Sequence, residues 1–341
     1  MTGKSLPPLD IVNRINHAPH VVILGAGASR ACCLNGDKSG SKLPLMADYI
    51  DVLDLKEEVS NAGFNVNENF EAIYSSAATK GMIDFVEILE RRTNEYFSTL
   101  ELPEQATLYD YLILSLRPKD IIVTFNWDPL LPQAFKRWRH LGPVLPKLAF
   151  LHGNVDVCVN TEKKQVRFCS DHPTNNDGFS KSKLLYPVLE KNYTDDPFIS
   201  HEWQNATTHL RDAYLVTVIG YSAPMSDVEA RSLLLEAWRK NPTQTLGEMF
   251  LIDVRSEDEV RKDWDDFISG THSSVSQKYD EGYLMRHPRR TCEAFAFATL
   301  QQTPWKEDRL STGVPFSELE AWFAPLIEEE LKGTLSGSPL H

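Results

Sequence analysis

The sequence has 341 residues, of which 42% are hydrophobic and 24% charged, and this balance is typical of a folded globular protein rather than a disordered or fibrous one. Its formal net charge of −13 argues against a general binder of nucleic-acid backbones, because such binding needs clustered Lys and Arg. The five cysteines form no C-x-x-C pair, so we expect no disulfide framework and a reducing, cytoplasmic location.

The N-terminal residues lack the apolar segment of a signal peptide, and the longest apolar runs are far too short to cross a bilayer. We therefore expect neither a signal peptide nor a transmembrane helix. The length favours a single domain over residues 1–330, followed by a loose tail over residues 331–341.

Short apolar runs, rich in β-branched residues, predict buried strands that stop at polar or glycine-rich residues. A polar excursion over residues 154–196 predicts short strands at most. In chain order, the predicted strands cover residues 20–24, 121–125, 147–151, 214–219 and 249–252.

Helical periodicity fills most of the intervals between these strands. Residues 43–116 are too long for one crossover helix, so we expect a helical insertion there. Pro129 begins another helix, and Ser226 or Asp227 caps a third whose apolar side includes Val228. Further helices are expected near residues 257–267 and 316–332. This alternation predicts an α/β, Rossmann-like parallel sheet with a helical insertion.

The carboxyl ends of parallel strands form the ligand crevice in such sheets. At the first end, Gly25 and Gly27 allow backbone amides to approach a pyrophosphate, and Ser29 adds a hydroxyl donor. A dehydrogenase fingerprint would have glycine in place of Arg30 and an acidic residue at a second strand about 20 residues onward. Neither is present, which disfavours an ordinary oxidoreductase. A plain tight turn between strand and helix remains the alternative.

Four motifs together resemble the sirtuin superfamily in order and spacing, over roughly residues 21–253. The likeness is strongest to the bacterial sirtuin-like effector branch, whose characterised members hydrolyse NAD in anti-phage defence. The motifs are Gly25-Ala26-Gly27-Ala28-Ser29, Thr124-Phe125-Asn126-Trp127-Asp128, Leu151-His152-Gly153 and Gly220-Tyr221-Ser222.

This resemblance implies that NAD binds as a substrate and that Asn126, Asp128 and His152 act on its nicotinamide riboside. Asn126 would position the reacting groups, Asp128 would stabilise positive charge on C1′, and His152 would accept a proton. No metal is expected, since Cys158 and Cys169 are too sparse for the zinc module of protein-deacylating sirtuins. The expected NAD-binding residues are Gly25, Ala26, Gly27, Ser29, Thr124, Gly220, Ser222 and Asp253.

Each of these residues also fits a simpler role. Asp128 suits a helix cap, His152 a structural histidine, Ser222 a turn and Asp253 an exposed loop carboxylate. The leading hypothesis is an NAD glycohydrolase. The alternatives are an NAD-dependent protein deacylase or ADP-ribosyltransferase, and a noncatalytic NAD or ADP-ribose sensor.

The resemblance to defence effectors also implies restraint until a trigger arrives. We therefore expect a homo-oligomer or a separate partner subunit, such as an ATPase or sensor protein. Neither direct nucleic-acid binding nor membrane association is expected.

Overall fold

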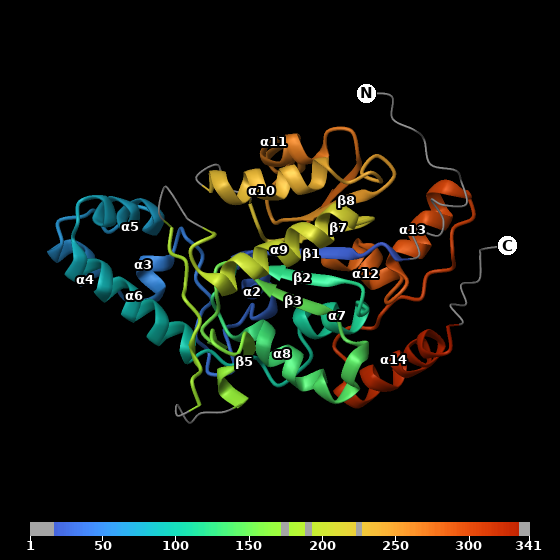
Figure 1. Ribbon diagram of the computed structural model, residues 1–341, viewed down its shortest axis with the longest axis horizontal. Coiled ribbons are helices and arrows are strands. Elements are labelled where there is room, and N and C mark those ends of the chain that lie inside the picture. The colour runs from blue at the N-terminus through green and yellow to red at the C-terminus, as the bar shows by residue number, and fades with distance from the viewer. Residues whose placement is uncertain (1–16, 172–176, 188–192, 223–226, 334–341) are drawn as a thin grey trace.

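The computed structural model describes residues 17–171, 177–187, 193–222 and 227–333, and a six-stranded parallel sheet lies at its centre (Figure 1). The α/β class with a parallel sheet, predicted from the alternation of strands and helices, is confirmed. In spatial order the strands are β3 (Lys147–Phe150), β2 (Ile121–Thr124), β1 (His20–Leu24), β7 (Leu215–Ile219), β8 (Glu248–Ile252) and β9 (His272–Ser276).

The six strands end in one row. In register, the last residue of each strand pairs with the last residue of its neighbour, so the loops that follow leave from a common edge. The strand order reverses between β1 and β7, and a ligand crevice is expected at such a switch point. Across the sheet, this row is Phe150, Thr124, Leu24, Ile219, Ile252 and Ser276.

The degree of burial explains which strands could be predicted from the sequence. Every residue of β1, β2 and β7 is buried, as expected for central parallel strands with β-branched and apolar side chains. The edge strand β9 is polar, partly exposed and rich in serine, and the sequence pattern did not predict it.

Helices cover the sheet in two layers. One layer contains α9 (Pro197–Asp212), α10 (Val228–Arg239) and α11 (Glu257–Ile268), which pack side by side. The other contains α2 (Ala26–Cys32), α7 (Leu108–Ser115), α8 (Leu130–Trp138) and α12 (Tyr283–Arg286), again in mutual contact.

Two details of these helices correct the sequence analysis. Val228 is 66% exposed, so it does not belong to the buried side of α10, which is formed by Ala230, Leu234, Ala237 and Trp238. The long helix α9 was not predicted, although Asp196 and Pro197 form a helix start: the Asp196 carboxylate accepts the backbone N–H groups of Phe198 and Ile199.

Between β1 and β2 the chain forms the helices expected over residues 43–116. In Figure 1 the first four of them project beyond one end of the sheet, whereas α7 returns beneath it. These helices are α3 (Tyr49–Val52), α4 (Lys56–Asn61), α5 (Phe70–Thr79), α6 (Ile83–Ser98) and α7.

The polar excursion forms a small antiparallel sheet of β5 (Gln165–Phe168), β4 (Val157–Asn160) and β6 (Ser180–Lys181). Cys158 and Cys169 form a disulfide there, with Cα atoms 5.1 Å apart. This pairing corrects the expectation of no disulfide. The antiparallel pairing of β4 with β5 brings the two cysteines together, and the sequence analysis did not predict this pairing.

The C-terminal part adds α13 (Thr291–Leu300) and α14 (Phe316–Leu331) at the other end of the sheet from the insertion (Figure 1). Short 3₁₀-helical segments in the described part of the chain are η1 (Arg139–Val144), which has a kink at Gly142, η2 (Cys169–Asp171) and η3 (Tyr279–Glu281). In the described ranges, no helix is long and apolar enough to cross a membrane. Most of the tail expected to be loose, residues 334–341, lies outside the described residues, as does Ser226.

Candidate active site

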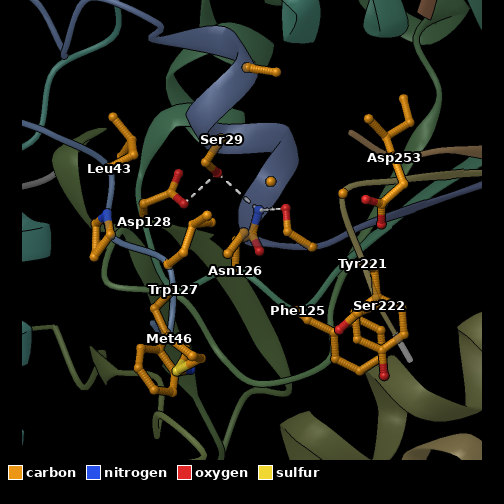
Figure 2. Close-up of a pocket in the computed structure, with 18 of the residues that line it drawn as sticks. Ser29, Leu43, Met46, Phe125, Asn126, Trp127, Asp128, Tyr221, Ser222 and Asp253 are labelled. Atoms are coloured by element: carbon orange, nitrogen blue, oxygen red, sulfur yellow. Dashed lines mark hydrogen bonds between the residues drawn. The ribbon is translucent and has the colours of Figure 1, made fainter. Parts of the chain in front are cut away.

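A cavity of about 610 Å³ opens at the edge where the parallel strands end. This volume is in the range of small-molecule sites in proteins. Residues after β1, β2, β3, β7 and β8 all line it, and several of them face one another in Figure 2. Of the expected site residues, it brings together Gly25, Ala26, Gly27, Ser29, Asn126, Asp128, His152, Gly220, Ser222 and Asp253.

The turns after β1 and β7 interlock through their glycines. Gly27 N–H donates to the Gly220 carbonyl at 3.0 Å, and Gly25 N–H donates to the Ile219 carbonyl at 3.1 Å. A Cβ atom on Gly220 would lie 2.5 Å from the backbone of Gly27 and Ala28, and the φ of Gly220 is +60°. Only glycine fits such a contact without displacing the backbone.

This interlock corrects the expected use of the glycine amides. The N–H groups of Gly25 and Gly27 bond to the neighbouring turn, so they are not available to a pyrophosphate as the sequence suggested. The Ala26 N–H has no partner within the described parts of the chain, and it lies at the start of α2 beside the cavity. The glycines therefore bring two turns into contact, and the cavity forms beside that contact.

Asn126 is oriented by its side-chain nitrogen. Its Nδ2 atom donates to the Gly25 carbonyl at 2.8 Å and also contacts Ser29 Oγ at 2.9 Å and the Tyr109 hydroxyl at 3.2 Å. A carbonyl can only accept, which fixes the nitrogen on that side. Among the described residues, no hydrogen bond uses Asn126 Oδ1, so this oxygen is left for a ligand in the cavity.

Thr124 has a supporting position instead of the expected contact with NAD. It is 1% exposed, does not line the cavity, and its hydroxyl accepts the backbone N–H of Asn126 at 3.0 Å. Asn154, which the sequence analysis missed, holds the same loop from the other side. Its amide nitrogen donates to the backbone carbonyl of Asp128 at 2.6 Å.

Asp128 is 4% exposed, and both of its carboxylate oxygens accept hydrogen bonds. Ser29 Oγ donates to one at 2.6 Å, and the backbone N–H of Leu130 donates to the other at 3.1 Å. The second bond is the helix cap considered as the simpler role, so Asp128 both caps α8 and faces the cavity. Burial raises the pKa of Asp128 above its ordinary value, although these hydrogen bonds oppose the shift.

Ser29 also departs from its expected role. Its hydroxyl has one proton, and the contact with the Asp128 carboxylate uses that proton, so the hydroxyl is not a free donor for a phosphate. The Tyr109 hydroxyl lies 2.6 Å from Ser29 Oγ. Burial raises the pKa of Tyr109 well above its ordinary value, which keeps this phenol protonated.

His152 lies at the end of β3, where it is 8% exposed and packs edge-on against the ring of Phe125. Its Nε2 atom is 3.1 Å from the Tyr193 hydroxyl and 3.6 Å from Asp227 Oδ2. Tyr193 in turn donates to Asp227 Oδ1 at 2.9 Å. Asp227 was expected to cap α10, but no side-chain cap bond is made there, and its carboxylate lies beside the histidine.

Asp253 follows β8 and forms an ion pair at the cavity wall. Arg255 donates to both of its oxygens, from Nε at 3.1 Å and from Nη2 at 2.9 Å, and its Nη1 reaches Asp263 at 2.6 Å. These hydrogen bonds to Asp253 raise the pKa of Arg255. A ribose at this wall would meet a carboxylate that already has a partner. Ser222, by contrast, is exposed at the cavity edge.

An apolar wall faces these polar groups. It consists of side chains from the segment after α2, from the insertion and from the strand-end loops, and Figure 2 shows Leu43, Met46 and Trp127 on the same side of the site as Asp128. Within the residues described, no group of three or more His, Cys, Asp or Glu side chains is arranged to hold a metal ion. The wall includes Leu43, Met46, Phe97, Leu108, Trp127 and Leu185.

Four long-range contacts of the site were not predicted from the sequence. Tyr109, Asn154, Tyr193 and Asp227 each contact an expected residue, but none belongs to a strand-end motif. The one available signal was Asn154, which directly follows the His152-Gly153 pair.

No protein-family model matches the chain, and no curated protein matches it. Solved Sir2 structures show a distant likeness. One, with a deacetylated p53 peptide and 3′-O-acetyl ADP ribose, is 13% identical, with 78% of this chain and 93% of that chain covered and a TM-score of 0.39. Sir2Tm bound to a propionylated peptide is 13% identical over 87% and 99%, with a TM-score of 0.35.

Proposed function

We propose that this chain is a sirtuin-like NAD glycohydrolase, which cleaves NAD to nicotinamide and ADP-ribose. The observation that carries the proposal is the convergence of Asn126, Asp128 and His152 on one cavity beside two interlocked glycine turns. A dinucleotide suits this cavity, because polar groups line the switch-point side and apolar side chains line the other.

In the proposed arrangement, the pyrophosphate lies by Ala26 and Ser222, and the adenosine ribose lies toward Asp253. The nicotinamide ring then occupies the apolar wall near Trp127. Asn126 Oδ1 accepts from the nicotinamide carboxamide or from water, since its Nδ2 is held by Gly25.

The reaction needs no group beyond water. A water oxygen bonds to the ribose C1′ while the bond from C1′ to the nicotinamide nitrogen breaks, and the bonding electron pair leaves with nicotinamide. Positive charge that develops at C1′ is stabilised by the Asp128 carboxylate. His152 accepts the proton that the water loses, and Tyr193 and Asp227 hold the imidazole in place.

The first test is nicotinamide release from NAD by the purified protein. His152→Ala is expected to lower the rate by about 10²- to 10⁴-fold, which is the usual contribution of a general base. Asn126→Ala is expected to abolish release as well. His140→Ala is the matched control, because His140 is half exposed, pairs with Glu320 and does not line the cavity.

Two results would contradict the proposal. One is intact NAD under every activating condition tried, including the presence of proteins encoded beside this one. The other is full activity in His152→Ala protein. Tight binding of NAD or ADP-ribose without turnover would instead favour the sensor alternative.

The apolar wall favours one further candidate, an NAD-dependent deacylase or ADP-ribosyltransferase. Leu43, Met46 and Trp127 offer an acyl chain an apolar surface beside Asn126. In that case an acyl-lysine or another nucleophile takes the place of water. Consumption of an acylated peptide together with NAD, in a fixed ratio, would select this candidate over hydrolysis.

The proposed biological setting is anti-phage defence, with NAD destruction restrained until infection. Such restraint is consistent with a homo-oligomer or with a separate ATPase or sensor subunit, in the cytoplasm. Measuring nicotinamide release by the chain alone and then with its neighbouring gene products tests this setting.

A further inference from the structure

Tyr109 reaches the site from the base of the helical insertion. It lies on α7, is completely buried, and places its hydroxyl 2.6 Å from Ser29 Oγ and 3.2 Å from Asn126 Nδ2. We propose that Tyr109 is a positioning residue that orients Asn126 and Asp128 for cleavage of the nicotinamide bond. This inference rests on the proposed function.

The order of protons along this group follows from what each atom can do. With Asp128 ionised, its Oδ2 only accepts, so the Ser29 proton points to it. Asn126 Nδ2 only donates. Asn126 Nδ2 has two protons, of which one goes to the Gly25 carbonyl and the other is shared between Ser29 Oγ and the Tyr109 hydroxyl. The Tyr109 hydroxyl donates to Ser29, so Asn126, Tyr109 and Ser29 form one hydrogen-bonded chain that ends at Asp128.

This chain links the two groups that act on the substrate. Asn126 can present Oδ1 to the cavity only while its nitrogen is held on the opposite side by Gly25, Ser29 and Tyr109. A hydrogen bond from Tyr109 polarises Ser29 and so strengthens its bond to the carboxylate. If the phenolic oxygen is removed, the Ser29 hydroxyl loses the hydrogen bond from Tyr109. It can then rotate away from Asp128 into the space that the oxygen occupied.

Packing alone does not explain a tyrosine at this position. Leu112 and Ile113, one helical turn along α7, are buried apolar side chains, and phenylalanine would fill nearly the same volume as Tyr109. Tyr111, on the same helix and 3% exposed, provides the comparison. Its hydroxyl accepts the backbone N–H of Gly313 at 2.8 Å and does not line the cavity.

The test compares Tyr109→Phe with Tyr111→Phe in the full chain. Tyr109→Phe is expected to lower kcat for nicotinamide release by at least about 10-fold while KM for NAD changes by less than about 2-fold, since a bond in a charged network is lost in the transition state. Tyr111→Phe is expected to retain wild-type kcat and KM. Equal kcat values for the two variants would overturn the inference.

A double-mutant cycle tests whether Tyr109 and Ser29 act through one hydrogen-bonded chain or independently. Ser29→Ala is expected to lower kcat at least as much as Tyr109→Phe, and the combined variant is expected to be no slower than Ser29→Ala alone. Multiplied effects would overturn the inference. If Tyr109→Phe fails to fold, Ser29→Ala is compared with the wild type instead. A lower kcat with an unchanged KM for NAD is then the expected result, and an unchanged kcat would overturn the inference.

The proposed function is tested on the wild-type protein, independently of the variants. A wild-type chain that never releases nicotinamide contradicts the function before any variant is compared. In that event the coupling of Tyr109→Phe with Ser29→Ala is measured by chemical unfolding, where additive effects would overturn the chain itself.

Discussion

The carboxylate of Asp128 accepts two hydrogen bonds and yet is so buried that its pKa is raised. Because the folded-state pKa is above the ordinary value of 3.8, ionisation of this group opposes folding. Its contribution to stability is complete below pH 3.8 and is lost as the pH rises through the raised pKa. At any pH above the raised pKa, the protein keeps a charge in its core at a cost in stability.

Asp128→Asn is therefore expected to be no less stable than the wild type at pH 8, with an advantage that shrinks as the pH falls toward 4. The same variant is expected to release nicotinamide at least about 100-fold more slowly, because it lacks the charge that stabilises C1′. Chemical unfolding at several pH values and a nicotinamide assay check the two effects.

An exposed carboxylate supplies the control for Asp128→Asn. Asp258 lies in the first turn of α11, outside the cavity, so Asp258→Asn is expected to leave activity unchanged. A wild-type protein that is more stable than Asp128→Asn at pH 8, by a margin that grows with pH, would contradict the account of burial.

At the level of elements, the turns after β1 and β7 are joined by backbone contacts that no side chain could replace. Gly220→Ala adds a Cβ atom 2.5 Å from the backbone of α2 at a φ of +60°. Overpacking and backbone strain together are expected to destabilise the protein by about 3 kcal/mol or more, with loss of turnover. Denaturant unfolding measures the change in free energy.

Gly270 offers a matched comparison for that substitution. Its φ is +81°, but a Cβ atom there meets nothing within 4 Å. Gly270→Ala is therefore expected to cost only about 1 kcal/mol from backbone strain, and activity is expected to persist. Equal losses of stability in the two variants would show that the interlock contributes nothing.

Hydrophobic patterning predicted the strands whose residues are mostly apolar and buried. Strands β1, β2, β3, β7 and β8 were expected within one or two residues of their observed bounds, and the polar residues after them share one edge. Strand β9 escaped prediction because an edge strand of polar residues has no apolar pattern. Helix α9 was not predicted because its first residues directly follow a polar segment.

Local sequence reveals which residues follow a strand, but not which atoms remain free. Ser29, Thr124 and the amides of Gly25 and Gly27 were expected to face NAD, and each has a partner inside the protein. These partners come from segments about 80 to 200 residues away in most cases, so no short-range pattern can identify them. Tyr109 and Asp227 are absent from the motifs for the same reason.

Over the whole molecule, a buried group of charges fastens the C-terminal helices to the start of β2. Glu293 on α13 pairs with Arg117 and, at 3.4 Å, with Lys119. Glu330 on α14 pairs with Arg289 at 2.5 Å. These pairs lie at the end of the sheet away from the cavity, so they hold the fold together without contacting the site.

Glu293→Ala leaves buried Arg117 and partly buried Lys119 without this partner and is expected to destabilise the protein by about 3 kcal/mol. KM for NAD is expected to stay unchanged at temperatures where the variant is folded. Glu328→Ala, which removes an exposed pair with Lys332, is expected to cost less than about 1 kcal/mol. Similar unfolding midpoints for the two variants would contradict the importance of the buried group.

The pairing of β1 has a consequence for synthesis of the chain. Leu24 pairs with Thr124 on one side and with Ile219 on the other, so the central strand leaves the ribosome about 100 residues before its first partner and about 200 before its second. At roughly 5–20 residues per second, the second interval lasts about 10–40 s. During that time at least one edge of an apolar strand is unpaired, and a chaperone that covers it would raise the yield of folded protein.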